Sequence, residues 1–165
     1  MDFNQMNCFN VKLNSINIII IFFLFCIIVS CSDSSENKEK EDITHVTAEF
    51  ASHYFNFDLN GAVSLCTRES GRWISFMASN IMQEDIDVLR SQDSGATYDV
   101  GAVTCVDDTS AVVECRVFNF LKIDTIGQAG KITRQATYEI PLVKRNGKWF
   151  VKMEGLLQSE RQNPD

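Results

Sequence analysis

The chain has 165 residues, 45% of them hydrophobic, and its 15 Lys and Arg against 22 Asp and Glu give a net charge of −7. An acidic chain without a basic cluster is a poor nucleic-acid binder, so the composition excludes that class of function. Once a leader of about 30 residues is set aside, the remaining length suits one domain.

A short apolar segment ends at a cysteine near the start of the chain. The twelve residues from Ile18 to Val29 are all apolar, too few for a spanning helix, which needs about 20. Ile28-Val29-Ser30-Cys31 resembles the bacterial lipobox. In such lipoproteins the cysteine thiol is diacylated and the chain is cut directly before it. We therefore expect a signal peptide over residues 1–30, lipid such as palmitate on Cys31, and a lipid anchor in a bacterial cell envelope. The alternatives are an ordinary secretory signal and an uncleaved signal anchor.

The next stretch is wholly polar. Ser32 to Asp42 contains no apolar residue, so we expect residues 31–42 to be a disordered tether. Serine directly after the cysteine resembles lipoproteins that are sent on to the outer membrane. Whether the domain then faces the periplasm or the cell surface stays open.

Helical periodicity begins at Ile43. Apolar residues at helical spacing predict a first helix, capped by Asp42 or Thr44. Its stripe is Ile43, Val46, Phe50, Tyr54 and Phe57. A short second helix, a third that starts after Thr67 or Ser70, and a fourth over residues 83–91 should follow. We expect the acidic residues that begin the fourth helix to be solvated and favoured by its dipole.

After Gly95 the period changes to two, which predicts strands. Pairing Val106 with Ala111 across the first turn puts Cys105 and Cys115 on opposite faces of the hairpin. Asn146-Gly147 is typical of a two-residue type I′ turn and pairs Leu142 with Val151. That register places Trp149 on the face that meets the helices.

Helices followed by two long hairpins predict an α+β domain over residues 43–158, with a short tail over 159–165. The helix, turn and helix of residues 49–70, ending in Thr67-Arg68-Glu69-Ser70, and the closing hairpin with Asn146-Gly147-Lys148-Trp149 carry a family resemblance. The domain resembles the NTF2-like (cystatin-like) family, and within it small bacterial lipoproteins often likened to lumazine-binding proteins. The resemblance implies N-terminal helices packed on one face of a curved four-stranded antiparallel sheet, with a cone-shaped pocket between them.

Few residues suggest chemistry. His53 and Tyr54 are the best candidates for a base and a hydrogen-bond donor, but neighbours on a helix point about 100° apart. The three cysteines after Cys31, which are Cys66, Cys105 and Cys115, include no Cys-x-x-Cys pair, so we expect neither a metal nor a cofactor. Whether two of them form a disulfide stays open. The ligand-pocket candidates are Tyr54, Trp73, Tyr138 and Trp149.

Two functions follow from this sequence. The first is an envelope lipoprotein whose non-catalytic domain binds a small apolar ligand or a partner protein. The alternative is an enzyme like the isomerases and dehydratases of the family, which would use the cone-shaped pocket. An aromatic, carbon-lined pocket would favour the first, whereas a buried carboxylate or imidazole beside a tyrosine would favour the second.

Overall fold

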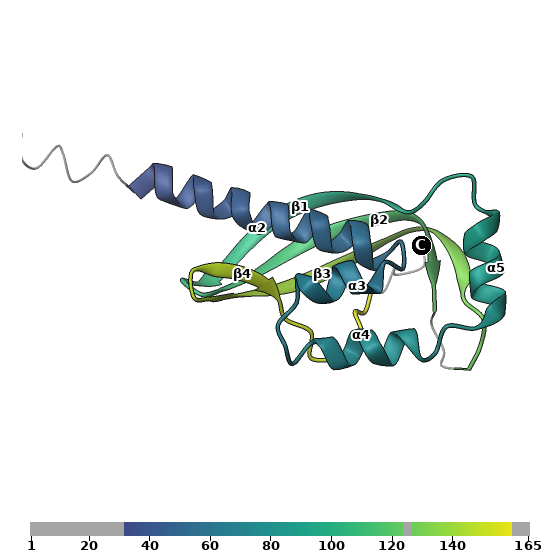
Figure 1. Cartoon of the computed structure of the whole chain (residues 1–165). Coiled ribbons are helices and arrows are strands. Elements are labelled where there is room, and N and C mark those ends of the chain that lie inside the picture. The colour runs from purple at the N-terminus through teal and green to yellow at the C-terminus, as the bar shows by residue number, and fades with distance from the viewer. Residues whose placement is uncertain (1–31, 124–126, 160–165) are drawn as a thin grey trace, which may run out of the picture. The chain divides into compact units, whose positions relative to one another are not determined.

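The computed structural model describes residues 32–123 and 127–159, with side chains from Ser35 onward (Figure 1). The expected signal peptide, Cys31 and residues 160–165 lie outside the described residues. The chain divides into two units, 1–39 and 40–165, and the sheet belongs to the second.

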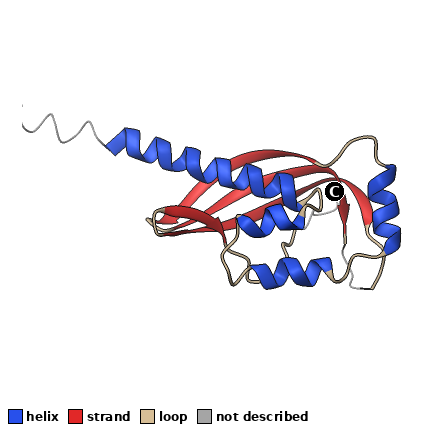
Figure 2. Ribbon diagram, in the orientation of Figure 1, coloured by secondary structure: helices blue, strands red, loops and turns tan. Residues whose placement is uncertain are grey.

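The second unit is a helical layer on an antiparallel sheet, which confirms the predicted α+β fold class (Figure 2). The helices of the chain are α2 (Ser32–Tyr54), α3 (Leu59–Ser64), α4 (Gly71–Ala78) and α5 (Gln83–Ser91). The strands are β1 (Thr97–Asp107), β2 (Ser110–Lys122), β3 (Lys131–Arg145) and β4 (Lys148–Val151), in the spatial order β1-β2-β3-β4. From Lys40 onward α2 lies along one face of the sheet, together with α3 and α4, while α5 stands at one end of it (Figure 1).

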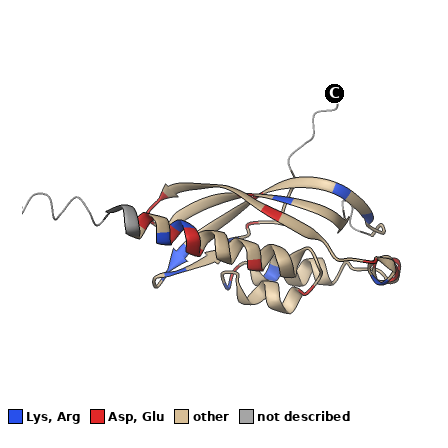
Figure 3. Ribbon diagram, turned by 90° about the horizontal axis from the view of Figure 1, so that it is seen from above, with Lys and Arg blue, Asp and Glu red and all other residues tan. Residues whose placement is uncertain are grey.

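The helix α2 begins at Ser32, so the prediction of a disordered tether over residues 31–42 is wrong for the residues that the structure describes. Acidic and basic residues alternate along this part of α2 (Figure 3), and Glu36 lies one turn before Lys40. Glu and Lys are good helix formers, and adding residues to an existing helix carries no nucleation cost. The predicted caps are also wrong, because Asp42 lies inside the helix and the Thr44 hydroxyl donates to the Lys40 carbonyl.

The core lies between α2 and the inner face of the sheet. Its fully buried side chains come from the predicted stripe of the first helix, from alternate residues of β2 and β3, and from single positions of α4 and β4. They include Ile43, Phe50, Ile74, Val113, Cys115, Val117, Ile140, Leu142 and Val151. Phe50 stacks on Tyr54 with ring centroids 5.1 Å apart, and this pair leads toward the aromatic end of the core.

The predicted register of the first hairpin holds only at its turn. Asp107 opposes Ser110 as expected, but Cys105 then opposes Ala111 and Val100 opposes Cys115, because the pairing shifts twice. Val106, which pairing with Ala111 would have put on the same face as that buried residue, is 67% exposed. Bulges insert residues without an alternating signal in the sequence, so a straight ladder is the wrong inference here.

The second hairpin agrees with its prediction. Asn146 and Gly147 have φ of 52° and 77°, as a type I′ turn needs, and Leu142 pairs with Val151. Trp149 is buried on the helix side. The Lys152 N–H donates to the Pro141 carbonyl, but proline has no N–H to return the bond, and β4 ends one residue earlier.

The free edge of β4 is bonded to the helical layer. Val151 donates to the Leu65 carbonyl and accepts from the Thr67 N–H, both at 2.9 Å. The buried Ser70 hydroxyl lies 2.7 Å from that of Thr67 and accepts from the Met153 N–H at 2.8 Å. The Thr67–Ser70 step therefore fastens α3 and α4 to the end of the sheet.

Asp85 is fully buried, which corrects the expectation that the acidic start of α5 is solvated. Its carboxylate accepts from the Met82 N–H at 2.8 Å and from the Gly130 N–H at 2.6 Å. It thus caps α5 and holds the β2–β3 connection at the same time.

Candidate functional site

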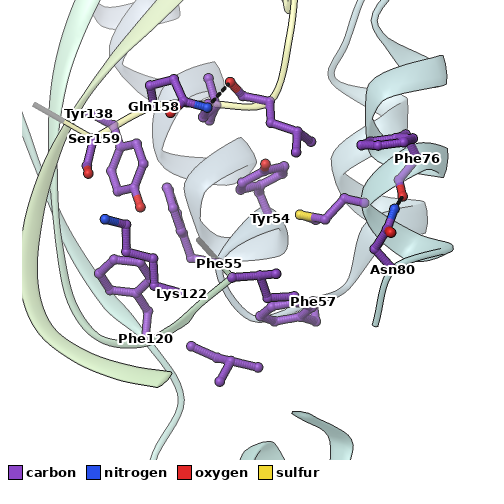
Figure 4. Close-up of a pocket in the computed structure, with 15 residues that line it drawn as sticks. Tyr54, Phe55, Phe57, Phe76, Asn80, Phe120, Lys122, Tyr138, Gln158 and Ser159 are labelled. Carbon is purple, nitrogen blue, oxygen red and sulfur yellow. Dashed lines mark hydrogen bonds between the residues drawn. The ribbon is translucent and has the colours of Figure 1, made fainter. Parts of the chain in front are cut away.

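A cavity of about 310 Å³ opens between the end of α2, α4, the far end of β2 and the C-terminal segment (Figure 4). Aromatic and aliphatic side chains dominate its wall. The lining residues are Tyr54, Phe55, Phe57, Phe76, Met77, Asn80, Phe120, Leu121, Lys122, Ile123, Tyr138, Leu156, Leu157, Gln158 and Ser159. The volume is at the lower end of the range usual for small-molecule sites, about 300–1,000 Å³.

The inner wall is a cluster of aromatic rings. Phe55 is 5.5 Å from Phe120 and 4.9 Å from Tyr138, measured between ring centroids, and it meets Tyr54 edge-on at 5.1 Å. Rings held by one another in this way lose little freedom when a ligand arrives. The cluster therefore makes a preformed apolar wall.

Phe57 reaches the cavity from an unusual backbone conformation. It follows the end of α2 with φ of 61°, and its N–H donates to the Tyr54 carbonyl while the Asp58 N–H donates to the His53 carbonyl. This is the Schellman arrangement, in which the left-handed position is usually glycine. Phenylalanine there costs about 1–2 kcal/mol. Backbone strain of this kind tends to collect at functional sites.

A second left-handed residue turns β2 toward the cavity. Asn119 has φ of 51°, and beyond it both Phe120 and Leu121 are buried. The break in alternation brings the last residues of β2, Phe120 to Lys122, into the lining.

The C-terminal segment closes one side. Ser159 pairs with Tyr138 through an isolated bridge, and the Gln158 amide donates to the Leu156 carbonyl at 3.3 Å. In Figure 4 the Tyr138 hydroxyl and the Lys122 amine lie at the side of the cavity where Ser159 lies. The cavity therefore has one polar end and an otherwise apolar wall.

The tyrosine at the other side stays protonated. Burial raises the pKa of the Tyr54 hydroxyl, and its hydrogen bond with the Leu157 backbone only partly opposes this rise. Tyr54 is therefore a neutral phenol at physiological pH and suits hydrogen bonding better than proton abstraction.

The four predicted pocket residues divide into two pairs. Tyr54 and Tyr138 line the cavity, whereas Trp73 and Trp149 are not among its lining residues. Trp149 is a core residue with the Lys144 amine 5.6 Å from its ring, and Arg72 lies 4.9 Å from the Trp73 ring. Their indole nitrogens are buried without a hydrogen-bond partner in the described structure.

His53 lies away from the lining. Its Nδ1 is 2.7 Å from the Asp58 carboxylate, at the surface beyond α2. The Gly61 backbone N–H and, secondly, His53 hold the pKa of the Asp58 carboxyl below its usual value. A Cβ on Gly61 would collide with both side chains, which explains a glycine at this position. The candidate base is therefore part of a helix-to-helix turn.

Sequence reasoning missed most of the wall, including Phe57, Met77 and Lys122. A signal for Lys122 existed, because it lies two residues after Phe120 and strand residues two apart share a face. Its place at a strand end next to a polar loop concealed it.

The described residues hold neither a cluster of three metal-ligating side chains nor a membrane-crossing helix. The metal search covers their His, Cys, Asp and Glu side chains. Within residues 32–123 and 127–159, no helix is both long and apolar enough to span a bilayer. Cys66, Cys105 and Cys115 are free, and burial raises the pKa of Cys66 to about 12 and that of Cys115 to about 11.

Comparison with known proteins found structural similarity at very low sequence identity. An NTF-2 like protein of unknown function from Shewanella oneidensis MR-1 is similar with 9% identity, a TM-score of 0.47, and coverage of 68% of this chain and 93% of that one. A protein of unknown function from Mycobacterium tuberculosis has 12% identity, a TM-score of 0.48, and coverage of 79% and 77%. A cystatin-like protein from Nostoc punctiforme has 12% identity, a TM-score of 0.43, and coverage of 76% and 93%. No family model and no curated protein matches the sequence.

Proposed function

We propose that this chain is a lipid-anchored envelope protein whose folded domain binds a small, mainly apolar ligand in the cavity below α2. The observation that carries this proposal is the aromatic wall built around Phe55, with Phe57 in a strained conformation beside it. Removing a flat apolar ligand from water against such a wall is favourable at roughly 25 cal/mol per Å² of buried apolar surface.

The lining favours binding over acid–base catalysis. Among the described lining residues there is no carboxylate and no imidazole. The remaining titratable side chains are Tyr54, Tyr138 and Lys122. An isomerase or dehydratase of the kind considered from the sequence needs a titratable base in the cavity. His53, the residue considered for that role, is engaged by Asp58 outside it.

The anchor part of the proposal rests on the sequence before Ser32. Several acyl chains on Cys31, each buried methylene contributing about 0.8 kcal/mol, would hold the protein firmly on a bilayer. Serine after the cysteine supports the outer membrane as its place. The ligand would then be a compound that is present in the cell envelope.

A cavity-filling substitution tests the ligand site. The full chain would be held in phosphatidylcholine nanodiscs and titrated calorimetrically with the neutral aromatic compounds indole and phenylbutanol, with empty discs as blanks. Met77→Trp places an indole inside the cavity from α4, so affinity should fall at least about tenfold. Ser75→Trp, two residues away on an exposed part of the same helix, is the matched control and should bind as the parent chain does.

Equal binding by the Met77→Trp and parent chains would place the ligand elsewhere and remove the proposal. The same conclusion follows if the parent chain binds neither compound more than the empty discs do.

A further inference from the structure

Tyr54 is a buried residue whose ring lies among the side chains that line the cavity (Figure 4). Only 7% of the residue is exposed. Phe50 stacks on the ring and Phe55 meets it edge-on, in both cases with ring centroids 5.1 Å apart. Because two neighbouring rings hold it, the Tyr54 hydroxyl has a fixed place in the cavity wall.

The Tyr54 oxygen accepts a hydrogen bond from the C-terminal segment. Burial raises the pKa of the hydroxyl, and the bond to the Leu157 backbone partly opposes that rise. A hydrogen bond lowers the pKa of a phenol when it favours the charged form, which can only accept. The Leu157 N–H is therefore the donor and the phenol oxygen the acceptor.

This bond leaves the hydroxyl proton of Tyr54 unused, since a phenol can donate one hydrogen bond as well as accept. Within residues 35–123 and 127–159, no acceptor for that proton is found. Buried tyrosine hydroxyls usually have a partner, and leaving a buried donor unsatisfied costs about 1–3 kcal/mol. Because Tyr54 lines the cavity, a ligand bound there can supply the missing acceptor.

The surroundings of Tyr54 favour an acceptor without charge. The burial that raises the pKa of its hydroxyl also disfavours any other negative charge placed beside it. The adjoining wall is aromatic, with Phe55 and Phe120 in contact at 5.5 Å between ring centroids. An aromatic body and a neutral acceptor therefore suit this part of the cavity.

We infer that the cavity takes uncharged aromatic molecules that carry a hydrogen-bond acceptor such as a carbonyl, with the acceptor at the Tyr54 hydroxyl and the ring against Phe55 and Phe120. This inference rests on the proposed ligand site and names its chemical class. Tyr54 determines specificity by orienting the ligand, and takes part in no chemical step.

Two ligands of nearly the same shape test this preference. Acetophenone carries a carbonyl where α-methylstyrene carries a methylene group, so only acetophenone has the acceptor. Both would be titrated into the full chain in phosphatidylcholine nanodiscs, with empty discs as blanks. Tyr54→Phe should lower the ratio of acetophenone affinity to α-methylstyrene affinity at least about fivefold. Taking the ratio within each chain cancels any general loss of affinity in the variant.

The carbonyl stretch of bound acetophenone reports the hydrogen bond directly. In infrared difference spectra it should lie at lower wavenumber in the parent chain than in Tyr54→Phe. The matched control is Tyr98→Phe, which removes a phenol hydroxyl from β1 at a residue that does not line the cavity. It should keep the affinity ratio and the carbonyl stretch of the parent chain, and a fall of the ratio in both variants would overturn the inference.

Two further outcomes separate this inference from the proposed function. If the affinity ratio is the same in the parent chain and in Tyr54→Phe, or if only indole and phenylbutanol bind, this inference falls while the ligand site stands. If the parent chain binds none of the four compounds more than empty discs do, both fall.

Discussion

The left-handed backbone at Phe57 lowers the stability of the fold, and the same residue supplies a ring to the cavity wall. Glycine has no Cβ to clash in this conformation, and alanine does. Comparing Phe57→Gly with Phe57→Ala cancels the loss of the ring and leaves the backbone term. We expect the glycine variant to be more stable than the alanine variant by about 1 kcal/mol in urea unfolding.

Both Phe57 variants should also bind indole more weakly than the parent chain, since both lose the ring. Equal stabilities of the two variants would mean that position 57 is not left-handed in solution. Unchanged indole binding would mean that the ring is not part of the ligand site.

Asp58 makes the end of α2 sensitive to acid. Because the pKa of its carboxyl is lowered in the folded state, it stabilises the fold above its unfolded pKa, about 3.9. That contribution is lost as the pH falls through the still lower folded value. Asp58→Asn should therefore lower Tm at neutral pH and narrow the gap in Tm between pH 7 and pH 3.

The control for Asp58 is Asp108→Asn, a change of the same kind in the exposed β1–β2 turn. It should leave the difference between the two pH values as it is in the parent chain. If the difference in Tm between pH 7 and pH 3 is the same in Asp58→Asn as in the parent chain, then the Asp58 turn does not contribute to the acid sensitivity of the fold.

At the scale of elements, the Thr67–Ser70 step decides how the helices are held on the sheet. Ser70→Ala removes the hydroxyl that the buried Met153 N–H donates to, and leaves that donor unsatisfied. We expect a loss of about 1–3 kcal/mol in the free energy of unfolding. Ser79→Ala, whose exposed hydroxyl donates to the Phe76 carbonyl and accepts from the Asn80 amide, both local contacts, should cost far less.

Similar losses in Ser70→Ala and Ser79→Ala would mean that the bond to Met153 adds nothing beyond local helix capping. Hydrogen exchange of the Met153 amide is the direct readout, since its protection should fall in Ser70→Ala alone.

Some elements were predictable from sequence and others were not, for physical reasons. Asn146-Gly147 forces a local turn, and the apolar pattern of Gln83–Ser91 marks a local helix, so both were found. The shifts in β1 arise from pairing with β2, and the cavity wall arises from five separate segments. Such long-range arrangements leave little trace in any local window. Tyr54 and Tyr138 were correctly predicted to line the pocket, because the helical period and the strand register put them on inward-facing positions.

At the scale of the molecule, the proposed anchor makes a prediction of its own. Cys31→Ala should leave an uncleaved precursor without acyl labelling, because both the thioether and the cleavage site depend on the thiol. Metabolic labelling with palmitate and detergent-phase partitioning would measure this. Ser35→Ala, a change just beyond the cleavage region, should be processed and labelled as the parent chain is. Normal processing in Cys31→Ala would point to an ordinary secretory signal.

The irregular pairing of β1 has a consequence for the behaviour of many copies together. β1 is an edge of the sheet, and a long straight edge is a template on which another chain can add. Its two shifts disturb the spacing of the outer N–H and C=O groups, and Asp99 and Asp107 bring negative charge to it. This edge therefore resists edge-to-edge aggregation, which would matter most where the proposed anchor holds many copies side by side.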